Sequence, residues 1–120
     1  MVKFNISIKR VYDEWQQNEG FRVLVDRLWP RGLSREKAGL DLWAKEIAPS
    51  DELRKWFNHE VGKWADFRNK YIKELNGSPE VVQNFLKDIH GKKQIVFLFG
   101  AKDKEHNQAL VLKEYIDSLV

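Results

Sequence analysis

The sequence contains no cysteine, so disulfides, thiol nucleophiles and cysteine-ligated metal centres are excluded. Its three histidines, His59, His90 and His106, lack the spacing of metal ligands, so no metal site is expected. No apolar run approaches the ~18 residues of a membrane span, and the first ten residues lack the apolar core of a signal peptide. These absences favour a cytoplasmic protein that has no membrane partner.

The familiar fingerprints of nucleotide binding and serine hydrolysis are missing as well. There is no Walker phosphate loop, no G-x-G-x-x-G and no G-x-S-x-G elbow, and we predict no cofactor. Internal repeats, low-complexity segments and linkers are also absent. A length of 120 residues is typical of one domain, so a single domain over residues 1–120 is expected.

The charge of the chain is mildly basic, with a formal net charge of +3 at pH 7. This value is compatible with anionic ligands or with nucleic acid. Lysine and arginine are interleaved with aspartate and glutamate throughout, however, which is also the pattern of an ordinary solvated surface.

Three segments have the patterns of strands. Residues 4–8 alternate between apolar and polar side chains, as a half-buried strand does. Residues 21–28 and 94–99 contain continuous apolar runs, which are typical of strands covered on both faces of a parallel sheet. The first of these two runs ends at Trp29-Pro30, because proline cannot donate a hydrogen bond to a strand ladder.

Helix signals fill most of the rest of the chain. Ser34 is a candidate cap for a short helix over residues 35–38, and Ser50 for a longer helix that breaks near residues 59–62. Gly77-Ser78-Pro79 indicates one helix end followed by a helix start. Asp103 is a candidate cap for a last helix that runs to about residue 119, whereas residues 39–48 match no pattern. The predicted fold is α/β, a small layered single domain with a short, at least partly parallel sheet flanked by helices.

The carboxyl ends of the two buried strands are the expected place for a ligand site. The segments DRLWPRG, residues 26–32, and GAKDKEHN, residues 100–107, follow these strands. If the strands are parallel neighbours, both segments face the same cleft. Arg27 and Arg31, with Lys102 and the amino end of the last helix, would then converge on an anion.

Other polar residues near these segments are further candidates. Ser50 and Asn107 are candidate ligand contacts, and Asn107 could instead bond only locally. Asp26 or Asp103 would orient the cations or act as a general base, and His59 or His106 would move protons near neutral pH.

Each candidate also has a purely structural interpretation. Asp26 and Arg27 could form an internal salt bridge with each other or with Asp103, since ion-pair networks resemble sites. Trp29 fits a core aromatic better than a stacking platform, and a lone histidine at a helix end is commonly a polar surface residue. Arg31 stands out because Pro30 and Gly32 restrict the backbone on both sides of it.

The run RVLVDRLWPRGLSREKAGLDLWAKEIAPSDELRKWFNH, with KWADF and GAKDKEHNQALVLKEYI further along, closely resembles the YeaO-like proteins. They are small bacterial and archaeal proteins that belong to a family without an assigned function, domain of unknown function 488. The resemblance spans residues 2–119 and implies a compact cytoplasmic α/β protein without an assigned activity. The positions that match the family pattern are Asp26, Arg27, Trp29, Pro30, Arg31, Gly32, Trp43, Pro49, Ser50, Leu53, Arg54, Trp56, His59, Trp64, Phe67, Tyr71, Lys102, Asp103, His106, Asn107 and Ala109.

These observations favour a protein that binds or acts on an anionic or phosphate-bearing small molecule at the strand ends. Whether it is an enzyme stays open. A nucleic-acid-binding or regulatory protein that uses the same basic cluster is an alternative, and strong salt dependence of binding would distinguish it. A non-catalytic interaction module with exposed tryptophans is a third possibility. The sequence contains no indication of the oligomeric state.

Overall fold

The strands assemble into one parallel sheet in the computed structural model, which describes residues 4–119. Its strand order is β1-β4-β2-β3, and each neighbouring pair is parallel. The alternation of helices with a parallel sheet confirms the predicted α/β layered fold. The strands are β1 Ile6–Arg10, β2 Phe21–Leu24, β3 Leu42–Trp43 and β4 Ile95–Phe99.

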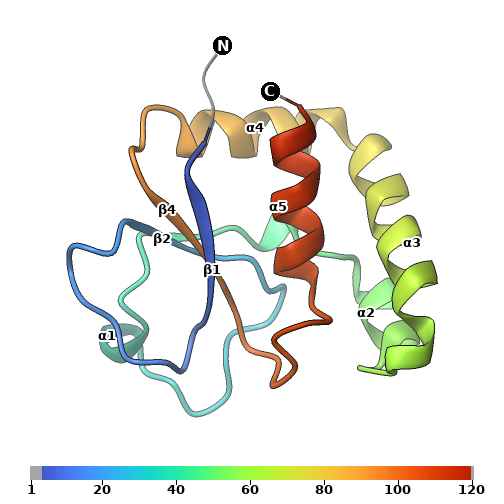
Figure 1. The fold of residues 1–120 in the computed structure, drawn as a ribbon, viewed down its shortest axis with the longest axis horizontal. Helices are drawn as coiled ribbons and strands as arrows, with labels where there is room; N and C mark the ends of the chain where they lie inside the picture. Colours follow the sequence, from blue (N-terminus) through green and yellow to red (C-terminus); the bar gives the residue numbers. More distant parts are fainter. Residues whose placement is uncertain (1–3, 120) are drawn as a thin grey trace.

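Helices cover both faces of this sheet. Figure 1 shows α1 on one side of the strands and α3 and α5 on the other. Each described helix is too short or too polar to cross a membrane. The helices are α1 Arg35–Ala38, α2 Asp51–Phe57, α3 Trp64–Asn76, α4 Pro79–Ile89 and α5 Gln108–Ser118, with single 3₁₀ turns at Lys45–Ile47 and Val61–Lys63.

The central strand β4 divides the core into two clusters. All five of its side chains are buried, and successive side chains point to opposite faces of a strand. Ile95, Phe97 and Phe99 therefore belong to the large cluster under α2 to α5. Val96 and Leu98 belong to a smaller cluster with the segment around α1. A strand buried on both faces explains the continuous apolar run in the sequence.

The two buried strands are parallel neighbours, which is the arrangement that the expected ligand site requires, with Leu24 opposite Leu98. Strand β2 is shorter than the predicted range of residues 21–28, however. The Val25 amide still donates to the Leu98 carbonyl at 3.0 Å, but the chain then leaves the sheet, and Leu28 is 54% exposed. Pairing with β4 stops because β4 itself ends at Phe99. The apolar character of residues 21–28 therefore overestimated the length of β2.

Some helix ends also differ from their predictions. The cap of α5 is Asn107 and not Asp103, so His106 precedes this helix. The predicted helix end and helix start at residues 77–79 are confirmed, but Gly77 has φ −82° and is not left-handed, and the Ser78 side chain makes no capping hydrogen bond. The break after α2 is confirmed: Asn58 takes a left-handed conformation there, with φ 46°.

Candidate functional site

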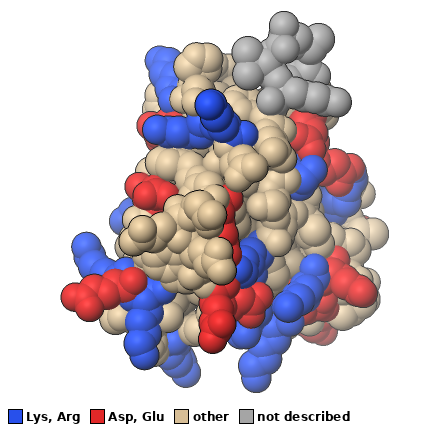
Figure 2. All heavy atoms as spheres, turned by 60° about the vertical axis from the view of Figure 1, so that its left-hand side comes forward, with Lys and Arg blue, Asp and Glu red and all other residues tan. Residues whose placement is uncertain are grey.

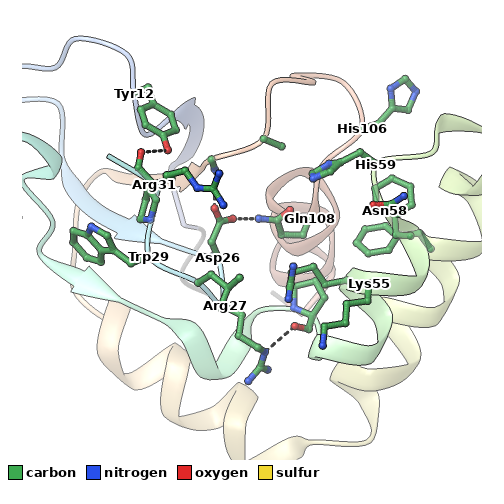
Figure 3. A pocket seen from close by; sticks show the side chains of 18 residues that line it. Tyr12, Asp26, Arg27, Trp29, Arg31, Lys55, Asn58, His59, His106 and Gln108 are labelled. Atoms are coloured by element: carbon green, nitrogen blue, oxygen red, sulfur yellow. Dashed lines mark hydrogen bonds between the residues drawn. The ribbon is translucent and has the colours of Figure 1, made fainter. Parts of the chain in front are cut away.

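The carboxyl ends of β1, β2 and β4 surround a cavity of about 440 Å³. Residues 26–31 form one wall, Gly100 and Ala101 close the end of β4, and α2 with the turn after it forms the opposite wall. Figure 3 shows Asp26 and Gln108 joined by a hydrogen bond inside this cavity. The sequence predicted a site at this edge of the sheet, and the largest concentration of the predicted residues is found here.

Asp26 is a largely buried carboxyl group that is held at both of its oxygens. The Gly100 amide donates to Oδ2 at 2.7 Å, and the Gln108 side-chain amide donates to Oδ1. The Trp43 indole N–H donates to the backbone carbonyl of Asp26 at 2.8 Å, which fixes the main chain as well. Burial raises the pKa of Asp26 to about 6, although these donors and the Arg54 charge oppose the rise.

Gly100 allows the close approach between β4 and Asp26. A Cβ atom at this position would lie 2.9 Å from Asp26 Oδ2, which is too close for a carbon atom and a carboxylate oxygen. The glycine after β4 therefore has a role beyond ending the strand, because it lets the amide reach the carboxylate.

Arg27 points toward the loop before α2. Its Nε donates to the Pro49 carbonyl at 2.9 Å and its Nη2 to the Ala48 carbonyl at 3.2 Å. Among residues 4–119, no ion pair joins Arg27 to Asp26 or either of them to Asp103, so the internal salt-bridge interpretation is wrong. Arg27 instead connects the end of β2 to the start of α2 through backbone carbonyls, and it lines the cavity.

Arg31 is exposed and lines the cavity. Its backbone is fixed by a hydrogen bond and by the glycine that follows it. The Tyr12 hydroxyl donates to the Arg31 carbonyl at 2.8 Å, and Gly32 takes a left-handed conformation with φ 75°. A left-handed φ is unfavourable for residues with a Cβ, so the glycine that follows Arg31 is needed for this turn.

Sequence reasoning assigned no role to Arg54 and Lys55 of α2, which add two more cations to the wall. The Nη2 of Arg54 pairs with Asp51 Oδ1 at 3.2 Å. Its Nε is buried and has no hydrogen-bond partner among the described residues. The available signal for Arg54 was its place among the positions that match the family pattern, whereas Lys55 and Gln108 carried none.

The two candidate histidines both line the cavity, but only His106 has a carboxylate partner within the described chain. Its Nδ1 lies 2.9 Å from Asp103 Oδ2, and its ring packs edge-on against Trp64 with 5.3 Å between centroids. A carboxylate at Nδ1 favours the tautomer that leaves Nε2 as an acceptor. His59 lies in the turn after α2, with φ 55°.

Four predicted site residues lie outside the cavity lining. Ser50 caps α2 by accepting from the Leu53 amide at 3.1 Å, and its hydroxyl donates to Glu74. Lys102 is exposed, and Asp103 reaches the cavity only through its partner His106.

Asn107 is only 1% exposed and accepts from the amides of Ala109 and Leu110. These two amides at the amino end of α5 are therefore already bonded and are not free to bind an anion.

Comparison of the chain with known proteins identifies its family. Residues 5–120 match a family model described as "Inactive DUF488-N3 subclade". The chain is 48% identical over 115 residues to the uncharacterised protein YeaO of Escherichia coli K12. The aligned residues make up 96% of this chain and 99% of that protein. It is 30% identical over 112 residues to uncharacterised proteins of Mycobacterium bovis and Mycobacterium tuberculosis, at 93% of each chain. No solved structure matches it.

Proposed function

The chain belongs to the DUF488 family, in the subclade described as inactive, and from this premise we propose that its cavity binds an anionic small molecule at the carboxyl ends of the strands. The word "inactive" in the family description favours binding over chemistry. Asp26 and His106 have the acid–base character that proton transfer needs, but the proposal requires only that they contact the ligand.

The observation that carries this proposal is that cationic residues from two separate elements line one cavity. Arg27 and Arg31 come from the segment after β2, whereas Arg54 and Lys55 come from α2. Asp26 is the one carboxylate that lines the cavity within residues 4–119, and it lies on the same wall as Arg27 and Arg31. Guanidinium groups present several N–H donors in a planar fork that matches carboxylate and phosphate oxygens, so this wall suits a small oxyanion.

Arg54 supports the same conclusion through its hydrogen bonding. A buried donor without an acceptor costs about 1–3 kcal/mol, and native structures pair the great majority of such groups. The Arg54 Nε is buried without a partner in the described chain, and a shift of this side chain toward the cavity that it lines would let an oxygen of a bound anion satisfy it.

The test compares Arg31→Ala and Arg27→Ala with the wild-type protein by urea denaturation, with and without potassium phosphate or malate at matched ionic strength. Both anions should stabilise the wild type, because a ligand that binds only the native state raises its stability. Without anion, Arg31→Ala should lose less than about 1 kcal/mol. Arg27→Ala should lose about 1–3 kcal/mol, since two backbone carbonyls lose their donor.

Arg31→Ala should also lose most of the stabilisation by anions, whereas Lys87→Gln should keep it. Lys87 is exposed on α4, away from the cavity, so this variant controls for the loss of one positive charge. The proposal is wrong if neither anion stabilises the wild type, or if the response of Lys87→Gln falls as far as that of Arg31→Ala.

A further inference from the structure

Asp26 has more acceptor capacity than its protein partners use. An ionised carboxylate offers about four lone-pair sites on its two oxygens. The described chain supplies one donor to each oxygen, the Gly100 amide to Oδ2 and the Gln108 side chain to Oδ1. Asp26 also lines the cavity, so acceptor sites remain for a ligand that brings a hydrogen of its own.

A carboxylate among cations has a predictable effect on the choice of anion. Arg27, Arg31, Arg54 and Lys55 attract any anion into the cavity. A bare oxyanion that approaches Asp26 meets a like charge in a partly desolvated place, where repulsion is stronger than in water. An anion with an O–H or N–H group beside its charge turns the same contact into a charge-assisted hydrogen bond.

Resting on the proposed function, we propose that this site selects anions that carry a hydrogen-bond donor next to the charged group, and that Asp26 is the residue that reads this donor. Hydrogen phosphate and 2-hydroxy carboxylates have the required chemistry. Sulfate and unsubstituted carboxylates lack the hydrogen, so their oxygens face the Asp26 charge without compensation. Anion specificity thus comes from Asp26, the one acidic residue among the described residues that line this basic cavity, and not from the arginines.

The groups around Asp26 keep it in the role of an acceptor. Gly100 from the end of β4 and Gln108 from α5 both donate to it, and Arg54 of α2 stabilises its negative charge. Two further ionisable groups lie near it, Tyr71 of α3 and Arg27 of its own segment. At about pH 7.5 this environment leaves Asp26 ionised, because that pH lies above its pKa of about 6.

The experiment is an NMR titration of ¹⁵N-labelled protein at about pH 7.5 with two matched pairs of anions. Phosphate and sulfate are similar in size and charge, but only phosphate keeps a proton at this pH. Malate and succinate differ by one hydroxyl group. The reporters are the Gly100 amide and the Gln108 side-chain amide, because both donate to Asp26. We expect phosphate and malate to bind at least about tenfold more tightly than their partners, equivalent to about 1.4 kcal/mol.

Asp26→Asn is the variant that isolates the charge. Gln108 can rotate its amide and accept from the new side-chain NH₂, while the remaining oxygen still accepts from Gly100, so the hydrogen bonds can be kept. Sulfate should then bind to the variant more tightly than to the wild type. Phosphate and sulfate affinities should differ by less than about threefold, compared with at least about tenfold in the wild type. The control Asp88→Asn, at an exposed position of α4, should leave the wild-type ratio unchanged.

The outcomes separate this inference from the proposed function. Equal affinities within both pairs for the wild type would overturn the selection by a donor, while anion binding itself would stand. An unchanged ratio in Asp26→Asn would show that another group reads the hydrogen. If none of the four anions binds, the proposed function fails and this inference fails with it. The wild-type comparison needs no variant, so misfolding of Asp26→Asn would not prevent the test.

Discussion

At the scale of single residues, burial makes ionisation of Asp26 less favourable, although the same carboxyl group lines the cavity. Removal from water disfavours its charged form, and this effect outweighs the two N–H donors and the Arg54 charge, so its pKa rises from 3.8 to about 6. The folded protein therefore holds the Asp26 proton up to a higher pH than the unfolded chain does. A carboxylate whose charged form is stabilised by ion pairs or hydrogen bonds more than it is destabilised by burial has the opposite shift.

The raised pKa predicts how stability depends on pH. Stability from the neutral carboxyl is fully present below the unfolded pKa of 3.8 and is lost as the pH rises through the folded pKa of about 6. Asp26→Asn cannot ionise, so its unfolding free energy relative to wild type should increase by about 2 kcal/mol between about pH 4 and about pH 7. Urea denaturation of both proteins across this range measures the difference. A constant difference would mean that Asp26 has an ordinary pKa in the folded protein.

At the scale of elements, the short helix α1 is held at its carboxyl end by a buried arginine and a tryptophan. Arg22 is only 2% exposed, and its Nη2 donates to the Ala38 carbonyl at 2.8 Å. The Trp15 indole donates to the Lys37 carbonyl at 2.8 Å. Gly39 then ends the helix with φ 55° and packs against the Trp15 ring. A helix of four residues is stabilised by such tertiary contacts and not by its own propensity.

The glycine that ends α1 and the glycine that ends α3 should respond differently to alanine. At Gly39 a Cβ would lie 1.9 Å from the Trp15 ring on a left-handed backbone, so Gly39→Ala should destabilise the protein by more than about 2 kcal/mol. At Gly77 φ is −82° and the nearest atom would be 3.4 Å away, so Gly77→Ala should change stability by less than about 1 kcal/mol. Urea denaturation of the two variants checks this contrast, and similar losses in both would contradict it.

At the scale of the whole molecule, charges of both signs are mixed across the surface. Figure 2 shows lysine and arginine side chains interspersed with acidic ones over the face it displays. The formal net charge of +3 on 120 residues is small for a protein that binds nucleic acid through its phosphates. A concave basic cavity with a carboxylate in its lining fits a small anion better than a duplex backbone.

Binding to double-stranded DNA should therefore be weak. At physiological salt we expect a Kd no tighter than the nonspecific range of about 10⁻⁴ to 10⁻⁶ M, because few phosphates can be neutralised at once. A gel-shift titration with random-sequence duplexes, repeated at several salt concentrations, measures both the affinity and its salt dependence. A submicromolar, sequence-selective complex would favour the regulatory alternative over the small-molecule site.

Much of the fold could be predicted because it depends on local pattern. The apolar run of β4 indicated a strand buried on both faces, and its pairing with β2 in parallel follows from the long helical connection. The end of β2 could not be predicted, since Leu28 has the apolar character of a strand residue but lies beyond the partner strand.

The edge of the sheet that carries the polar cluster follows from the order of residues along the chain, because parallel strands bring their carboxyl ends together. Asp26, Arg27 and Arg31 were predicted for that reason. The partners of these residues depend on how the helices pack against the sheet. Arg54 and Gln108 come from helices whose rotation against the sheet is set by packing, and Asp103 and Asn107 are used in local hydrogen bonds before α5. Local pattern places a residue along the chain, but only the packed core sets the direction in which its side chain points.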